Sequence, residues 1–198
     1  MNFPDIYLAS ASPRRAELLQ QIGVPFTQIY TAIDETVLPN DLPLQYVERM
    51  AHAKAQAGLD YMQQQQLLAK PVLGADTAVV LETGEILGKP GSAEQAIAYL
   101  HKLSAKTHYV MSAVAVLNHR GFCQVRSQQN AVTFCALSTQ QITDYVATGE
   151  GIDKAGSYAI QGLAAIFVTS IKGSFSGIMG LPLFETRLLL EQVKQHEQ

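Results

Sequence analysis

The sequence predicts an α/β protein with a mixed sheet, and three features lead to this fold class. A short apolar run, Ile6–Ala9, has the composition of a buried strand and passes directly into a helical pattern. Two longer strand-like runs, Thr107–Leu117 and Phe122–Phe134, are joined by a short polar turn and form an antiparallel hairpin. Capping-box patterns open helices at Ser92 and Ser138. Strands, hairpins and helices therefore share one chain of 198 residues.

The other elements are predicted from the same kinds of pattern. They are a strand over Val24–Tyr30, a loop framed by Pro39 and Pro43, a helix over Leu44–Met62, a strand pair from Pro71 to Leu87 that turns at Thr83–Gly84, a strand over Ala164–Ile171, and a final helix from Gly180 to about Lys194. We find no internal repeat and no linker rich in Pro, Gly or Ser. Residues 1–198 are therefore expected to form a single domain.

The turn after the first strand has the features of an anion-binding site. Ser12 is placed to be the N-cap of the following helix, and Pro13 suits its first position. Such a turn leaves backbone N–H groups at the positive end of the helix dipole. Arg14 and Arg15 lie in the first turn, where that dipole disfavours cations. An anionic ligand explains them better than helix stability does, so this turn is predicted to bind phosphate.

Asp76 is the sharpest candidate for chemistry, because it lies within an apolar, β-branched run. Burying a carboxylate is costly unless it is paired, hydrogen-bonded or metal-bound, and perturbed carboxylates gather at functional sites. The alternative is a strand-end Asp satisfied by local backbone N–H groups. Taken alone, Lys54 on its helix, Lys89 in a Gly-Lys-Pro turn and Glu35 in a loop are typical of ordinary structural positions. Gln161 beside Gly162 could equally be a polar residue at the start of a strand.

Composition and missing motifs exclude several classes of function. The net charge of −3 gives no overall basic field for a long nucleic acid. The five histidines lack zinc-ligand spacing, and there is neither a GxSxG elbow nor a GxxxxGK[ST] loop. The isolated Cys123 and Cys135 fit a reduced, cytoplasmic compartment, and no run is long enough to cross a membrane. What remains is a set of cations for phosphates and carboxylates for a hard metal.

Five motifs together resemble the Maf family of nucleotide pyrophosphatases. They are Leu8-Ala9-Ser10-Ala11-Ser12-Pro13-Arg14-Arg15, Gly74-Ala75-Asp76-Thr77, Gly88-Lys89-Pro90, the stretch from Asp153 to Gly162, and Gly180-Leu181-Pro182-Leu183. They occur in the family's order and extend over almost the whole chain.

The resemblance implies a two-lobed α/β fold similar to inosine-triphosphate pyrophosphatases, with a central nucleotide cleft. It implies hydrolysis of a nucleoside triphosphate to the monophosphate and pyrophosphate with a divalent cation (Mg, Mn or Co). Asp76 would be the proton acceptor that activates water, and Glu35 would help Asp76 to hold the metal. The phosphate path would be lined by Ser10, Ser12, Arg15, Lys54 and Lys89.

The resemblance also points to the branch of the family that acts on dTTP and UTP. That branch carries Arg after Ser-Pro, Thr after the catalytic Asp and Gln before Gly, and this chain has Arg14, Thr77 and Gln161 there. A Gln amide both donates and accepts, which matches the O4 and N3–H edge of uracil or thymine.

Two alternatives stay open at this point. One is a nucleotide-regulated binding protein that restrains septum formation, and the other is the same hydrolysis of 7-methyl-GTP. A homodimer is expected from the family resemblance alone. The sequence does not decide among dTTP, UTP and modified pyrimidine nucleotides, nor among the metals.

Overall fold

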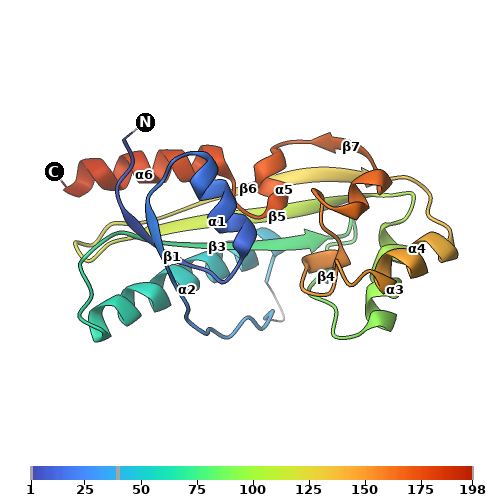
Figure 1. The fold of residues 1–198 in the computed structure, drawn as a ribbon, viewed down its shortest axis with the longest axis horizontal. Coiled ribbons are helices and arrows are strands. Elements are labelled where there is room, and N and C mark those ends of the chain that lie inside the picture. The colour runs from blue at the N-terminus through green and yellow to red at the C-terminus, as the bar shows by residue number, and fades with distance from the viewer. Residues whose placement is uncertain (1, 39–40, 198) are drawn as a thin grey trace. The chain divides into compact units, whose positions relative to one another are not determined.

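The structure is a computed structural model that describes residues 2–38 and 41–197 (Figure 1). Pro39, one of the two prolines expected to frame a loop, lies outside this part. The elements in chain order are β1 (Ile6–Ala9), α1 (Pro13–Gln21), β2 (Phe26–Ile29), α2 (Pro43–Gln64), β3 (Val72–Val80), β4 (Ile86–Leu87), α3 (Ala93–Leu103), β5 (Thr107–Leu117), β6 (Cys123–Phe134), α4 (Thr139–Ala147), the 3₁₀ helices η1 (Ala155–Ser157) and η2 (Leu163–Phe167), β7 (Val168–Lys172), α5 (Phe175–Met179) and α6 (Leu183–Glu197).

The strands of the described residues form a seven-stranded mixed sheet, which confirms the predicted fold class. Their order is β2-β1-β3-β5-β6-β7, with β4 paired to β3. β1 runs parallel to β2, with Ile6 opposite Phe26, and parallel to β3, with Tyr7 opposite Val72. β4 is antiparallel to β3, and β7 is antiparallel to β6. Parallel and antiparallel pairs therefore occur in one sheet.

The chain divides into two compact units. The first comprises Met1–Asp76, Ser112–Gln128 and Gly180–Gln198, and the second comprises Thr77–Met111 and Gln129–Met179. The chain passes from one unit to the other inside β3, β5 and β6, and a fourth time between Met179, where α5 ends, and Gly180. Among the helices of the described ranges, none is long and apolar enough to cross a membrane.

In the first unit, the strand-to-helix turn has the predicted form. All four residues of β1 are buried, Ser12 is the N-cap of α1 with extended backbone angles, and Pro13 begins the helix. Leu18 and Leu19 are the buried side chains of α1. Figure 1 shows α2 and α6 on opposite sides of β3 within this unit.

The second unit has its own hydrophobic core. Leu100 and Leu103 from α3 and Ile142 from α4 pack in one cluster with Phe134 and Phe167. Ser92 and Ser138 cap α3 and α4 as predicted, each accepting a hydrogen bond from a backbone N–H three residues on. The capping box at Ser138 is complete.

The predicted strand over Ala164–Ile171 is wrong in its first half. Residues Leu163–Phe167 form the 3₁₀ helix η2, and the strand β7 covers only Val168–Lys172. The apolar run Leu-Ala-Ala-Ile-Phe is compatible with a strand or a helix, and a carboxylate from elsewhere in the chain favours the helix. Glu150 accepts hydrogen bonds from the backbone N–H groups of Leu163 and Ala164, which favours a helical start.

His108 of β5 is a buried histidine whose hydrogen-bond partner is an uncharged hydroxyl group. Its Nε2 shares a hydrogen bond of 2.8 Å with the Tyr158 hydroxyl, and its ring meets the Phe134 ring edge-on. Its Nδ1 is buried and has no hydrogen-bond partner among the described residues. Burial lowers the pKa of His108 to about 4, so the ring is neutral near pH 7.

This lowered pKa predicts a loss of stability in mild acid. Between pH 6.5 and about 4 the unfolded chain binds a proton at His108 that the folded chain does not. The free energy of unfolding therefore keeps its full value above pH 6.5 and decreases as the pH falls through this window, by about 3 kcal/mol in total. Denaturant unfolding of the wild type and of His108→Gln from pH 7 to pH 4 measures it. The variant should lose less stability over this range, and equal losses would contradict the prediction.

Candidate active site

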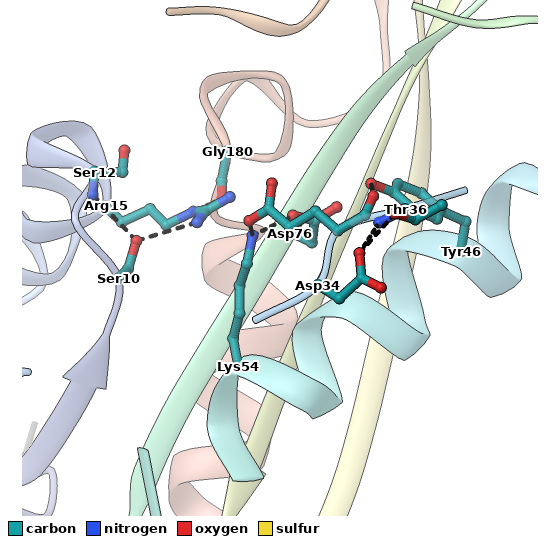
Figure 2. Close-up of polar contacts among 10 residues, drawn as sticks. Ser10, Ser12, Arg15, Asp34, Thr36, Tyr46, Lys54, Asp76 and Gly180 are labelled. Carbon is teal, nitrogen blue, oxygen red and sulfur yellow. Dashed lines mark hydrogen bonds and ion pairs between the residues drawn. The ribbon is translucent and has the colours of Figure 1, made fainter. Parts of the chain in front are cut away.

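The turn after β1 brings two serines and an arginine together. The Ser10 hydroxyl accepts hydrogen bonds from the Ser12 backbone N–H at 3.2 Å and from Arg15 Nη1 at 3.1 Å. Arg15 Nε donates to the Gly180 carbonyl at 2.9 Å (Figure 2). The Arg15 guanidinium is therefore held by two segments that lie far apart in sequence. The Ser12 side chain makes no capping hydrogen bond, although Ser12 occupies the N-cap.

The two arginines of this turn differ in their surroundings. Burial lowers the pKa of Arg15, while the nearby negative charge of Asp76 opposes that shift. Asp76 therefore lies close enough to Arg15 for their opposite charges to attract each other. Arg14 is half-buried, and it lies close enough to Arg15 for their charges to repel.

Asp76, Lys54 and Glu35 meet at one ammonium group. Lys54 Nζ donates to Asp76 Oδ1 at 2.7 Å and forms an ion pair with Glu35 Oε1 at 2.8 Å. Figure 2 shows the Lys54 side chain rising from α2 to reach Asp76 on β3. The three residues come from a loop, a helix and a strand. The structure thus brings together the residues to which the family resemblance assigns proton transfer (Asp76), metal binding (Glu35) and phosphate binding (Lys54).

The two carboxylates of this cluster have different environments. Asp76 is only 7% exposed, whereas the Glu35 side chain is 48% exposed. Burial raises the pKa of Asp76, and the positive charges of Lys54 and Arg15 oppose this shift. The negative charge of Glu35 raises the pKa of Asp76 further. Asp76 therefore combines a buried position with two cations that stabilise its charged form.

Lys54 reaches Asp76 because α2 packs very closely on β3. Side chains at i and i+2 of a strand share a face, so Gly74 and Asp76 both face α2. A Cβ atom at Gly74 would lie 2.4 Å from the Ala51 carbonyl oxygen and 2.4 Å from the Ala55 nitrogen. Gly58 of α2 is similarly crowded, with Val72 and Ala9 within 3 Å of an added Cβ. Glycine at 74 is thus required by space, since its φ is not positive.

The segment that carries Glu35 is held by residues that the sequence analysis missed. The Tyr46 hydroxyl donates to the Glu35 carbonyl at 3.0 Å, and Arg49 Nη2 donates to the Thr36 carbonyl at 3.2 Å. Within the segment, Asp34 Oδ1 accepts from the Thr36 N–H at 2.9 Å (Figure 2). Burial, together with the charges of Asp76 and Glu35, raises the pKa of Tyr46 to about 12.

A sequence signal for Tyr46 exists. Tyr46 and Lys54 lie eight residues apart on α2, which places both on one face of the helix. No such spacing identifies Arg49, whose role follows only from the path of the loop.

The remaining candidate residues belong to the second unit. Thr77 follows Asp76 in β3 and is half-buried, and Lys89 is exposed just after β4. Gln161 is exposed in the turn before η2. The Gly88 carbonyl accepts from the Gly156 N–H at 3.1 Å, which joins the Gly88-Lys89-Pro90 turn to the loop after α4.

Metal ligands are sparse in the part of the chain that the structure covers. No group of three or more His, Cys, Asp and Glu residues is arranged to hold a metal there. Asp76 and Glu35 are the two carboxylates that converge on a common point, and that point is occupied by the Lys54 ammonium.

The fold and this cluster of cations and carboxylates define a protein suited to bind and hydrolyse a phosphate compound. Residues 5–193 match the model of the family described as Maf-like protein. The chain belongs to that family.

Known relatives extend along nearly the whole chain. A protein of Aromatoleum aromaticum named dTTP/UTP pyrophosphatase is 50% identical over 195 residues, covering 94% of each chain. A Neisseria meningitidis protein of the same name is 46% identical over 190 residues, covering 95% of this chain and 94% of that protein. Among solved structures, a Mycobacterium abscessus dITP/XTP pyrophosphatase aligns with a TM-score of 0.47 at 13% identity, over 98% of both chains.

The crowding at Gly74 predicts that Gly74→Ala is destabilising. The added methyl meets backbone atoms of α2, which cannot move aside as a flexible side chain can, so we expect a loss of about 1–3 kcal/mol. It should also separate Lys54 from Asp76. Denaturant unfolding measures the loss, with Gly88→Ala as the control because a Cβ there meets nothing within 4 Å. Equal stabilities of the two variants would show that α2 is free to shift.

Proposed function

We propose that this protein hydrolyses dTTP and UTP to the nucleoside monophosphate and pyrophosphate. The observation that carries the proposal is the buried Asp76 carboxylate held at 2.7 Å by Lys54, which in turn pairs with Glu35. The activity is supported by relatives named dTTP/UTP pyrophosphatase at 46–50% identity over nearly the full chain. The substrate class is supported by the cations gathered around the same site.

Asp76 is the general base of the proposed reaction. It accepts a proton from a water molecule, whose oxygen bonds to the α-phosphorus while the bond from that phosphorus to the bridging oxygen breaks. Pyrophosphate leaves with the electron pair of that bond. A raised pKa makes Asp76 a better proton acceptor than an ordinary carboxylate, and the positive charges of Lys54 and Arg15 favour its ionised form. Burial of Asp76 also keeps the base out of competing solvent.

The phosphates are bound by the turn after β1 and by nearby cations. Arg15 already has Ser10 and the Gly180 carbonyl as fixed partners, so its guanidinium is oriented before substrate arrives. The backbone N–H groups at the start of α1, the Ser12 hydroxyl and Arg14 add donors at the same helix end. The resemblance to the family assigns Lys89, an exposed cation of the second unit, to the binding of phosphate as well. These donors stabilise the charge that develops on the phosphoryl oxygens.

A divalent cation fits the carboxylates of this site. Magnesium is typically held by one or two carboxylates plus substrate phosphates and waters, and Asp76 and Glu35 supply two carboxylates that already converge on a cation. Asp76 and Glu35 would hold the ion. When bound, a divalent ion neutralises negative charge on phosphoryl oxygens and orients them. The chain's own contribution is to keep the two carboxylates together through Lys54 and to hold the Glu35 segment through Tyr46.

Base recognition is assigned to Gln161 and Thr77. The Gln161 amide offers both a donor and an acceptor, as the N3–H and O4 edge of uracil and thymine requires. Gln161 is exposed, so its amide is available to a ligand. A guanine edge has a different donor pattern, which a carboxylate would suit better. The pyrimidine preference therefore follows from this residue.

The proposal predicts that Asp76→Asn strongly slows pyrophosphate release. We would measure release from dTTP, UTP, CTP, dATP, GTP and 7-methyl-GTP with Mg²⁺ or Mn²⁺. The wild type should hydrolyse dTTP and UTP, and Asp76→Asn should lower kcat by about 10²–10⁴-fold because an amide cannot accept the proton. Asp144→Asn is the control, since Asp144 is exposed on α4 and its side chain accepts a hydrogen bond from the Gln140 amide on the same helix.

The other outcomes of this assay are equally informative. Activity that survives in Asp76→Asn would remove Asp76 as the base and make Glu35→Gln the next variant. Hydrolysis of 7-methyl-GTP in place of dTTP and UTP would overturn the pyrimidine assignment. Nucleotide binding without hydrolysis by the wild type would favour the nucleotide-regulated binding protein instead.

A further inference from the structure

The loop that carries Gln161 is fastened by a carboxylate to which the sequence analysis assigned no role. Glu150 lies just after α4, which ends at Ala147 with Thr148 as its C-cap, and Gly149 adopts a positive φ of 74°. The Glu150 N–H donates to the Thr148 hydroxyl at 3.3 Å, and that hydroxyl donates to the Tyr145 carbonyl. The backbone of Glu150 is therefore fixed to the end of α4.

The Glu150 side chain accepts three hydrogen bonds. Its Oε1 accepts from the Tyr145 hydroxyl at 2.9 Å and from the Ala164 N–H at 3.4 Å, and its Oε2 accepts from the Leu163 N–H at 2.8 Å. Leu163 and Ala164 are the first two residues of η2, whose own N-cap, Gly162, has no side chain. Glu150 thus supplies the cap of η2 from 13 residues upstream.

Gly162 is shaped to admit this carboxylate. A Cβ atom at Gly162 would lie 2.3 Å from Glu150 Oε2 and 2.5 Å from its carboxyl carbon. The φ of Gly162 is −105°, a value that other residues adopt readily, so the glycine is required by the approach of Glu150 and not by its backbone angles. The glycine that follows Gln161 therefore has a structural explanation in Glu150.

The same contact closes the loop between residues 150 and 164. The Gly162 N–H donates to the Ala159 carbonyl at 3.0 Å, which forms a tight turn with Gln161 as its third residue. Tyr158, Ala159 and Ile160 are buried before that turn, and Glu150 holds the backbone directly after it. Gln161 is the exposed residue between these two anchored segments. Glu150 therefore anchors the turn that carries Gln161 on its C-terminal side.

We propose that Glu150 is a positioning residue for base recognition, because its carboxylate holds the turn that presents Gln161. This inference rests on the proposed function, in which the Gln161 amide reads the pyrimidine. A variant without the Glu150 carboxylate keeps Asp76, Lys54 and Glu35, but it loses the hydrogen bonds that anchor the turn carrying Gln161. The defect then falls on discrimination between bases and on KM, with little effect on the chemical step.

The test is steady-state hydrolysis of dTTP, UTP and CTP by the wild type, Glu150→Ala and Glu150→Gln. For Glu150→Ala we expect KM for dTTP and UTP to rise about tenfold or more, kcat to stay within about threefold, and the preference for dTTP over CTP to fall about tenfold. Glu150→Gln keeps one carbonyl acceptor and should recover part of that preference. Glu150→Ala combined with Gln161→Ala should be no worse than Gln161→Ala alone, because both act on one contact with the base.

Two further variants separate positioning from a general loss of structure. Glu82→Ala removes an exposed carboxylate from the same unit and should leave KM, kcat and the preference for dTTP over CTP unchanged. Gly162→Ala keeps the Glu150 carboxylate but displaces it, and should reproduce the kinetics of Glu150→Ala, so it serves if that variant does not fold. Hydrogen exchange of the Leu163 and Ala164 amides should be faster in both Glu150→Ala and Gly162→Ala.

The outcomes distinguish this inference from the proposed function. If the wild type hydrolyses neither dTTP nor UTP, the proposed function fails and this inference fails with it. If the wild type is active but folded Glu150→Ala keeps the wild-type preference for dTTP over CTP, only the role of Glu150 is overturned. A loss confined to kcat at constant KM would also overturn it.

Discussion

The candidate site of the first unit depends on how closely α2 packs against β3. At Gly74 the strand carries no side chain, and the backbone of α2 at Ala51 and Ala55 occupies the space that a Cβ would need. Lys54 precedes Ala55, and Asp76 lies two residues after Gly74 on the same strand face. The close packing therefore sets the separation between the Lys54 ammonium and the Asp76 carboxylate. The position of the candidate base is a consequence of backbone packing.

Burial of Asp76 is tolerated because its charge is shared within a small network. Lys54 contacts both Asp76 and Glu35, and Arg15 adds a second positive charge that stabilises the ionised form of Asp76. A buried ion pair contributes little net stability, since desolvation offsets most of the attraction. The value of this network is in orientation: the ammonium group keeps the two carboxylates together, and Tyr46 holds the backbone of the Glu35 segment. The arrangement suits a site that must receive a highly charged substrate.

Close approach at glycine recurs in the second unit. Gly162 admits the Glu150 carboxylate as Gly74 admits the backbone of α2, and neither glycine has a positive φ. In each case the glycine lies next to, or two residues from, a residue with a proposed role in the reaction. These glycines therefore belong to the packing that positions Asp76 and Gln161, and not to turns that need unusual backbone angles.

Local chemistry was readable from the sequence, and long-range contacts were not. The strand-turn-helix around Ser12 and Pro13, the helix starts at Ser92 and Ser138, and the suspicion attached to Asp76 all follow from neighbouring residues. The partners of Asp76 could not be identified from the sequence pattern, because Lys54 lies 22 residues away and is unremarkable on its own helix. The start of β7 was misplaced for the same reason, since the carboxylate that caps η2 lies 13 residues upstream. The sequence by itself determined the elements and the candidate residues. Tertiary packing decided which charges meet, because the distance between two side chains depends on how their backbones pack.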